Sequence, residues 1–365
     1  PWIFRDQLSS AAQVFADGQW LRLVDGQNQV VGHGIYESDG AIAIRLLRTG
    51  AAPPDAAWLR DTLRAAIDKR AALATLTDGI RLVHGESDGI PAIVADRFGD
   101  ALVVSSYSAG ADALARYAAR VLAELVTVRH VVLRPARRRR GPVLPPRVLR
   151  GAPPEIVHFE ESGLRFAVDL AEGHKTGTYL DLRGLRRAVA AAPLASARVL
   201  NLFAYTGMLG RAAEAAGAAT IVQVDASERA LAFAAAHHVV DPARHRFVTA
   251  DVLAWLPALP PEGDGFDLVI VDPPSMTSRK AQVPAVLAAY RKLYRAAARQ
   301  VRDGGVLVAA CCTSRVPREA FHRVVGEALG AGFAMERELP PEPDHPIGFP
   351  EADYLKIGWW RRAAS

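Results

Sequence analysis

The sequence is poor in cysteine, and the only two, Cys311 and Cys312, are adjacent. Neighbouring residues of an extended strand point to opposite faces, so we expect no structural disulfide between them. Two cysteines are also too few for a typical zinc site, and we expect no bound metal. Reduced thiols are typical of the cytoplasm, which is the location that this composition predicts.

Long apolar runs are also missing. No stretch of about 18 uncharged apolar residues occurs, so we expect no membrane span. The first six residues lack the charged and then apolar pattern of a secretory signal. Since 50% of the 365 residues are nonetheless hydrophobic, the chain is long and apolar enough for two or three packed domains.

Positive charge is modest overall and concentrated in one place. The formal net charge is +5, which is compatible with a polyanionic partner without demanding one. One stretch without acids carries Arg134, Arg137, Arg138, Arg139, Arg140, Arg147 and Arg150. Two interpretations stay open: a solvated loop, or a segment that contacts phosphates and whose binding would weaken with salt.

The patterns divide the chain into three parts. Residues 1–48 alternate short apolar stretches with turns such as Asp25-Gly26, which predicts a small β-barrel. Residues 49–168 predict an α+β middle domain that contains the basic loop 134–150. Its predicted elements are helices at 56–75 and 110–126, strands within 80–107 and at 128–134, and a hairpin over 156–170.

The third part, residues 169–365, has the pattern of an α/β domain. The predicted strands are 198–202, 219–224, 245–249, 266–271 and 305–312, and the predicted helices are 183–192, 207–217, 227–238 and 281–301. Such alternation predicts a parallel sheet with helices on both faces.

A strand-to-helix turn is the first candidate for a ligand site. The apolar strand that ends at Phe203 runs into Ala204-Tyr205-Thr206-Gly207, which opens a helix. Only Gly207 and Gly210 are present, so the turn is not a GxGxxG dinucleotide fingerprint. A turn of this kind places backbone N–H groups beside a ligand, at the edge of the sheet where ligands bind in α/β folds.

Acids follow the next three strands of this domain. Asp225 ends one strand, where its carboxylate could accept hydrogen bonds from both ribose hydroxyls. Asp251 follows the second, where it could accept from an adenine amino group, and Asp272-Pro273-Pro274 follows the third. Acids at three successive strand ends after such a turn are rare by chance, so the pattern predicts a site for an adenosine-containing cofactor.

These stretches resemble the successive motifs of class I S-adenosylmethionine-dependent methyltransferases. The resemblance implies S-adenosylmethionine bound over a seven-stranded Rossmann-like sheet; spacing alone does not distinguish this cofactor from a nucleotide. The implied cofactor-binding residues are Phe203, Ala204, Tyr205, Thr206, Gly207, Asp225, Ala226, Ser227, Asp251, Val252, Asp272 and Pro273.

The cysteines end the strand predicted over 305–312, whose end should lie beside Asp272. Carbon 5 of a pyrimidine is not nucleophilic, so its methylation needs a thiolate that adds to carbon 6 and makes carbon 5 enamine-like. Removal of the carbon-5 proton then expels the thiolate. The alternative is that both cysteines are small buried hydrophobic residues, which is the usual fate of a free cysteine.

The whole chain resembles the bacterial 23S ribosomal RNA cytosine-C5 methyltransferases that carry an N-terminal PUA domain. The matching stretches are Pro1–Phe4, Gly85–Pro91, Asp96–Gly99, Gly173–Gly177, Tyr179–Arg183, Asp272–Pro274 and Asp344–Pro346. The family's Ser-Cys-Ser falls on Cys311-Cys312-Thr313, which makes Cys312 the implied nucleophile. The family's PUA domain begins upstream of Pro1, so we expect an N-terminally truncated copy here.

The same resemblance implies roles for further residues. Asp272 would contact the base edge or the methyl-transfer region, and Pro273 and Pro274 would shape the pocket. Tyr179, Asp181 and Arg183 would lie beside the cofactor. On the RNA side we expect Pro274, Lys175, His345, Arg137, Arg138, Arg139 and Arg140, with 23S ribosomal RNA as the partner and a homodimer left open.

Three alternatives remain at this stage. Residues 275–280 depart from the cytosine enzymes and resemble the related guanine-N7 module, in which a nucleophilic ring nitrogen needs no cysteine. An inactive RNA-binding module and a small-molecule methyltransferase are the other two. His237 and His238, late in a predicted helix, are expected to be surface or capping residues.

Overall fold

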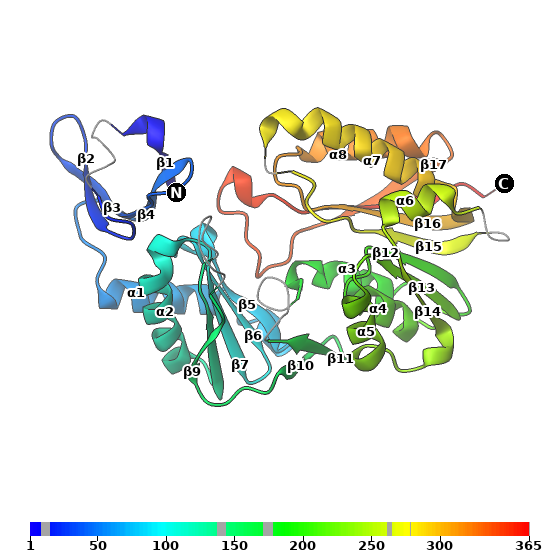
Figure 1. Ribbon diagram of the computed structural model, residues 1–365, viewed down its shortest axis with the longest axis horizontal. Helices are drawn as coiled ribbons and strands as arrows, with labels where there is room; N and C mark the ends of the chain where they lie inside the picture. Colours follow the sequence, from blue (N-terminus) through cyan, green and yellow to red (C-terminus); the bar gives the residue numbers. More distant parts are fainter. Residues whose placement is uncertain (9–14, 137–143, 171–177, 261–264, 278, 365) are drawn as a thin grey trace. The chain divides into compact units, whose positions relative to one another are not determined.

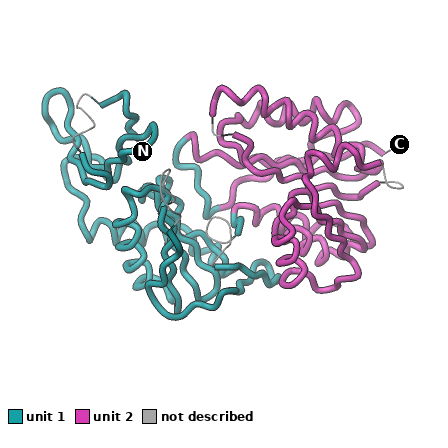
Figure 2. The backbone as a smooth tube through the Cα atoms, viewed as in Figure 1, with its two compact units in different colours: residues 1–180, 343–349 teal, residues 181–342, 350–365 magenta. Residues whose placement is uncertain are grey.

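The computed structural model describes residues 1–8, 15–136, 144–170, 178–260, 265–277 and 279–364. They form two compact units (Figure 2). The first comprises residues 1–180 and 343–349, and the second comprises 181–342 and 350–365. The domain boundaries expected at 48/49 and 168/169 stay predictions. No helix among these described ranges is long and apolar enough to cross a membrane.

A four-stranded antiparallel sheet opens the first unit. Its strands are β1 (Trp2–Phe4), β2 (Trp20–Val24), β3 (Val30–Tyr36) and β4 (Ile42–Thr49), in the order β1-β4-β3-β2. The strands that pair in the described part of this region form an open sheet with β1 and β2 at its edges, so closure into the expected barrel is not seen there.

The middle of the first unit is a five-stranded sheet with two helices packed on it (Figure 1). The elements are α1 (Ala56–Asp68), β5 (Gly79–His84), β6 (Ile93–Phe98), β7 (Ala101–Ser106), α2 (Asp112–Leu125), β8 (His130–Arg134) and β9 (Arg147–Arg150). Leu59 and Leu63 of α1 and Leu122 of α2 are buried against the strands in one apolar core. The hairpin β10 (Ile156–Glu161) and β11 (Leu164–Asp169) follows, close to its predicted position.

Two boundaries in this part differ from the predictions. The helix expected over 56–75 ends at Asp68, and a separate 3₁₀ turn covers Leu73–Thr75. The basic loop expected over 134–150 contains the short edge strand β9, which pairs with β8 in antiparallel fashion. All four residues of β9 are exposed, so no alternation of apolar and polar residues marked it as a strand.

A short segment from late in the chain completes the first unit. Residues 343–349 belong to it, and Asp344 is their fully buried anchor. The Asp344 carboxylate accepts a hydrogen bond from the backbone N–H of Arg81 in β5 (2.9 Å). The guanidinium of Arg70 donates to the backbone carbonyl oxygen of Asp344 (3.2 Å).

The second unit is built on a seven-stranded sheet in the order β14-β13-β12-β15-β16-β18-β17. Its strands are β12 (Arg198–Leu202), β13 (Thr220–Asp225), β14 (His245–Thr249), β15 (Phe266–Val271), β16 (Val301–Cys311), β17 (Phe333–Leu339) and β18 (Lys356–Arg362). The first five are parallel to one another, and β18 and β17 are added antiparallel at one edge. The predicted α/β class with a Rossmann-like sheet is confirmed.

Helices cover both faces of this sheet (Figure 1). They are α3 (Arg183–Ala190), α4 (Met208–Ala215), α5 (Glu228–His237), α6 (Val252–Ala258), α7 (Val283–Ala298) and α8 (Arg318–Leu329). Tyr290, Tyr294 and Phe321 from α7 and α8 pack in a fully buried aromatic cluster against β16. The predicted helix 281–301 ends early because β16 already begins at Val301, with a register shift opposite Phe266.

Candidate active site

The turn after β12 has an unusual backbone. Phe203, Tyr205 and Gly207 all have positive φ angles, of 59°, 48° and 74°. A left-handed conformation costs a non-glycine residue about 1–3 kcal/mol and is concentrated at binding sites. Hydrogen bonds hold the turn: the N–H of Ala204 donates to the carbonyl of Val224 (3.0 Å), and that of Gly207 to the carbonyl of Ala204 (2.8 Å). The strained turn therefore lies directly beside the end of β13.

Asp225, the last residue of β13, connects this turn to the next one. One carboxylate oxygen accepts the N–H of Tyr205 (2.8 Å), and the other accepts the N–H of Ser227 (2.9 Å). Ser227 in turn caps α5 by accepting from the N–H of Ala230 (3.2 Å). Asp225 is half-buried, and each of its oxygens has a second lone pair for a ligand hydroxyl. Ala226, between the two turns, is exposed.

Asp251 follows β14 and caps α6. Its carboxylate accepts the N–H of Leu253 (3.0 Å), and the side chain is otherwise exposed. The side chain of Val252 is buried in the core, so only its backbone could contact a ligand. The carboxylates of Asp225 and Asp251, at the ends of neighbouring strands, are acceptors of the kind that ribose hydroxyls and an adenine amino group need, so this donor set fits S-adenosylmethionine.

A buried polar network lies beneath the turn. The side-chain oxygen of Gln223 accepts from the amide of Asn201 (3.3 Å), and its nitrogen lies 3.0 Å from Nδ1 of His245. Burial lowers the pKa of His245, although the carboxylate of Glu214, 3.6 Å from Nε2, acts in the opposite direction. A neutral His245 with its proton on Nε2 can accept from Gln223 through Nδ1. Oδ1 of Asn201 and Nε2 of His245 are buried without a hydrogen-bond partner among the described residues.

Glycines allow helix α4 to sit on this network. A Cβ added at Gly210 would lie 2.4 Å from the side-chain carbon of Gln223, and one added at Gly207 would lie 2.7 Å from Cβ of Ala234. His238 approaches the turn from the other side, with Nδ1 2.5 Å from the carbonyl oxygen of Thr206. His238 is buried and so is not a surface residue, but it is the C-cap of α5, whose backbone N–H donates to the carbonyl of Ala234 (2.9 Å), so the capping part of the expectation is confirmed; His237 is exposed as expected.

The two cysteines occupy different environments at the end of β16. Cys311 is fully buried (0% exposed) in the core, where the hydroxyl of Tyr290 lies 3.4 Å from its sulfur. Cys312 is only partly buried, and its Sγ lies 3.6 Å from the carbonyl oxygen of Pro273. The structure thus brings Cys312 to the Asp272-Pro273-Pro274 segment.

The segment that follows Cys312 is fixed by buried polar side chains. Oγ1 of Thr313 accepts the N–H of Met276 (3.2 Å) and shares a hydrogen bond with the hydroxyl of Tyr290 (2.9 Å). Lys356, 1% exposed, donates to the carbonyl oxygens of Thr313 (3.2 Å) and Tyr354 (3.0 Å). The strand end and the loop after Pro274 are therefore held against each other.

Burial also shifts the acidity of these groups. It lowers the pKa of Lys356, against the opposing effect of the thiols and of Asp353. It raises the pKa values of Tyr290 and Tyr294, so both hydroxyls stay protonated and act as hydrogen-bond donors or acceptors only. Sequence reasoning missed Tyr290, Gln223 and Lys356, because a polar residue on an apolar helix or strand gives no sign of its partner.

The remaining predicted residues lie in several places. Asp181 is buried and accepts from the hydroxyl of Tyr354 (2.6 Å). Arg183, 1% exposed, forms an ion pair with Glu342 (3.1 Å), which gives it a structural role in the second unit. Tyr179 is half-buried in the last residues of the first unit. Their roles beside the cofactor stay predictions.

The residues expected on the RNA side are only partly described. His345 belongs to the first unit, is buried, and lies with Nδ1 2.8 Å from the carboxylate of Asp344. Its ring packs against that of His84, 5.1 Å away. Pro274 is exposed after Pro273. Lys175 and the run Arg137–Arg140 lie outside the described residues. No group of three or more His, Cys, Asp or Glu side chains in the described ranges could hold a metal ion.

Comparison with known families identifies the unit that carries these strand ends. Residues 110–354 match the model of S-adenosylmethionine-dependent methyltransferases. The chain belongs to this family. Its cofactor is S-adenosylmethionine. Residues 1–49 match a PUA-like domain, in agreement with the resemblance found in the sequence.

Similar proteins match this methyltransferase along nearly its whole length. A ribosomal RNA large subunit methyltransferase of Deinococcus radiodurans is 34% identical over 98% of this chain and 92% of its own. Ribosomal RNA large subunit methyltransferase I of Shewanella amazonensis is also 34% identical, over 98% and 93%. Among solved structures, a SAM-dependent methyltransferase of Streptococcus mutans has the same fold, with a TM-score of 0.81, 21% identity, and coverage of 95% and 92%.

Proposed function

We propose that this methyltransferase forms 5-methylcytosine in large-subunit ribosomal RNA through a covalent adduct between Cys312 and the base. Two relatives that align over nearly the full length are ribosomal RNA large subunit methyltransferases, which supports the substrate class. The expected target within that class is 23S ribosomal RNA, and the expected location is the cytoplasm.

The position of Cys312 is the observation that carries this proposal. Its thiol lies at the strand end next to Pro273, on the sheet edge where Asp225 and Asp251 also end their strands. Bound S-adenosylmethionine supplies an electrophilic methyl group. The Cys312 thiolate would add to carbon 6 and so make carbon 5 nucleophilic. Carbon 5 would then bond to the methyl group as the bond between that methyl and the cofactor sulfur breaks. Loss of the carbon-5 proton to a base would finally let the carbon–sulfur bond to Cys312 break, and the thiolate would leave.

Asp272 and the two prolines would place the base. Asp272 is half-buried at the end of β15, from where its carboxylate could accept from an exocyclic amino group such as that of cytosine. Pro273 is buried, which keeps its carbonyl oxygen in place beside the thiol. We expect Asp272, Pro273 and Pro274 to position the base against both the thiol and the methyl donor.

Guanine-N7 methylation is the second candidate, because the loop after Pro274 resembles that of the N7 enzymes. The structure gives this loop an internal role: Thr277 is buried, and its hydroxyl donates to the side-chain oxygen of Gln282 (2.6 Å). Met276 is tied to Thr313 through its N–H. These contacts give Met276 and Thr277 a packing role that does not depend on the base that is methylated. Cys312 is therefore the group that distinguishes cytosine-C5 from guanine-N7 methylation.

The experiment compares Cys312→Ala with Cys311→Ala. Ribosomal RNA from a strain that lacks the gene is the substrate, nucleosides are mapped by mass spectrometry, and cofactor affinity is measured by calorimetry. We expect Cys312→Ala to abolish methylation with unchanged affinity for S-adenosylmethionine. Cys311→Ala removes a buried atom and so should lower stability, yet it should still form 5-methylcytidine. Full activity of Cys312→Ala with 7-methylguanosine as product would establish the second candidate instead.

A further inference from the structure

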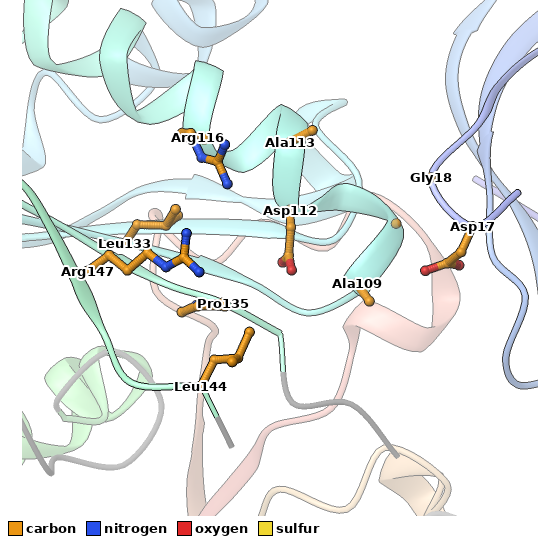
Figure 3. Close-up of a pocket in the computed structure, with 11 residues that line it drawn as sticks. Asp17, Gly18, Ala109, Asp112, Ala113, Arg116, Leu133, Pro135, Leu144 and Arg147 are labelled. Atoms are coloured by element: carbon orange, nitrogen blue, oxygen red, sulfur yellow. The ribbon is translucent and has the colours of Figure 1, made fainter. Parts of the chain in front are cut away.

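Two cavities flank helix α2 in the first unit, away from the strand ends of the methyltransferase sheet. The first, of about 350 Å³, is lined by Asp17, Asp112, Arg116 and Arg147 among others (Figure 3). The second, of about 310 Å³, is lined by the three aromatic side chains of Trp20, Trp58 and Tyr117. Ala113 borders both cavities, so they are neighbours across one turn of the helix.

Arg116 and Arg147 give the first cavity its charge. Both residues are exposed, and their guanidinium groups are directed toward the same space, one from α2 and one from β9 (Figure 3). Within the described part of the chain, neither forms an ion pair with a carboxylate. Two such groups that converge in a concave site are suited to an anion such as phosphate.

The two acids of this cavity have backbone partners. Asp17 accepts the N–H of Ser38 (2.9 Å), and Asp112 accepts the N–H of Ala136 (3.2 Å). Their charges remain and oppose an anion near them, so we expect a phosphate to bind at the arginine side.

The second cavity exposes large aromatic surfaces. Trp20 on β2 is 49% exposed and Tyr117 on α2 is 43% exposed, while Trp58 is partly buried beneath them. Gly18 and Gly110, which line the first cavity, permit the close contact of the two chain segments there, since a Cβ added at Gly18 would lie 2.9 Å from the carbonyl oxygen of Gly110. Exposed aromatic rings next to arginines are the elements with which proteins bind single-stranded nucleic acid.

We infer that Trp20, Arg116, Tyr117 and Arg147 form a binding surface, here named the α2 surface, for an unpaired stretch of RNA. Phosphates contact Arg116 and Arg147, and bases stack on Tyr117 and Trp20. The inference rests on the proposed RNA substrate but not on which atom is methylated. It adds a contact site in the first unit to the strand ends at which methylation takes place in the second.

The test measures binding of the full chain to a fluorescent single-stranded oligoribonucleotide of about 12 nucleotides by anisotropy over a range of salt concentrations. Arg116→Gln and Arg147→Gln should each weaken binding at low salt and lower the slope of log affinity against log salt by about 0.7. Tyr117→Ala should weaken binding about tenfold with the slope unchanged, and Tyr117→Phe should retain the affinity.

Arg129→Gln is the matched control. Arg129 is exposed and in the same unit, but its guanidinium pairs with Asp100, so the same change of charge should leave the salt slope unaltered. Wild-type slopes in both arginine variants, or wild-type affinity in Tyr117→Ala, would overturn the inference. Equal affinity for a duplex of the same sequence would show a general polyanion surface and would overturn it too. Failure of the proposed chemistry is separate, because it changes the methylated nucleoside and leaves these slopes as they are.

Discussion

At the scale of single residues, environment rather than residue type separates the two cysteines. Cys311 and Cys312 are adjacent, yet one is enclosed by Tyr290 and the core and the other reaches the loop of Pro273. Adjacent positions of a strand face opposite sides, and here one side is the hydrophobic core. A thiol that must attack a base has to be on the other side, which is why the assignment of Cys312 is consistent with the fold.

A single methyl group at position 210 should disturb the cofactor site. In Gly210→Ala the new Cβ would lie 2.4 Å from the Gln223 side chain, and overpacking of this kind costs about 1–3 kcal/mol. We expect a lower melting temperature and weaker S-adenosylmethionine binding, since Gln223 supports the turn. Gly332→Ala is the control, because nothing lies within 4 Å of its Cβ. Equal melting temperatures of the two variants would contradict the prediction.

At the scale of elements, the strand ends of β12, β13 and β14 are fixed from below by buried polar groups. Gln223 crosses from β13 to both neighbours, with Asn201 of β12 on one side and His245 of β14 on the other. An unpaired polar group is costly in a buried sheet, so the network favours the neutral form of His245, whose Nδ1 can accept from Gln223. The network therefore makes the geometry of the cofactor turn sensitive to the charge of His245.

Acid should weaken the second unit through His245. Burial lowers the folded-state pKa of His245, so below the ordinary histidine pKa of about 6.5 the unfolded chain takes up a proton that the folded chain does not. The stabilising contribution is therefore complete above that pH and is lost as the pH falls toward the lowered folded pKa. We expect the wild type to lose more melting temperature between neutral and mildly acidic pH than His245→Gln. The exposed His237→Gln serves as control, and identical pH profiles for all three proteins would argue against this role.

At the scale of the whole molecule, the chain passes from one unit to the other more than once. It leaves the second unit after Glu342, contributes residues 343–349 to the first, and returns at Pro350 (Figure 2). Asp344 fixes residues 343–349 in the first unit: its carboxylate accepts the N–H of Arg81 and contacts the ring of His345. The short segment thus makes the folding of the first unit depend on residues from the methyltransferase half of the sequence.

Removal of that anchor should release the segment. Asp344→Ala leaves a buried N–H and a buried imidazole without their acceptor, at about 1–3 kcal/mol for each group. We expect faster hydrogen exchange in residues 343–349 and in β5, with unchanged exchange in β12. Asp344→Asn keeps an acceptor oxygen and should retain most of the protection. Unaltered exchange in the alanine variant would mean that other contacts hold the segment.

The parallel part of the methyltransferase sheet could be predicted closely, but its antiparallel edge could not. Strands 198–202 and 266–271 coincide with β12 and β15, because buried parallel strands are largely apolar runs bounded by turn residues. Strand 245–249 coincides with β14, although that strand lies at the edge of the sheet and has no buried residue. By contrast, the five central residues of β17 are all exposed, so this strand has no apolar periodicity to identify it. Its position depends on pairing with β18, a contact between segments far apart in the chain.

The sequence by itself determined the family, the order of the strand-end acids and the residue types that can bind the cofactor, because these follow from local patterns along the chain. Only the tertiary structure decided which thiol reaches Pro273, which polar side chains support the turn, and where residues 343–349 belong. Those properties depend on burial and on distances between distant segments, and no local pattern encodes them. The same holds for the α2 surface, whose residues come from β2, α2 and β9 and meet only in the folded first unit.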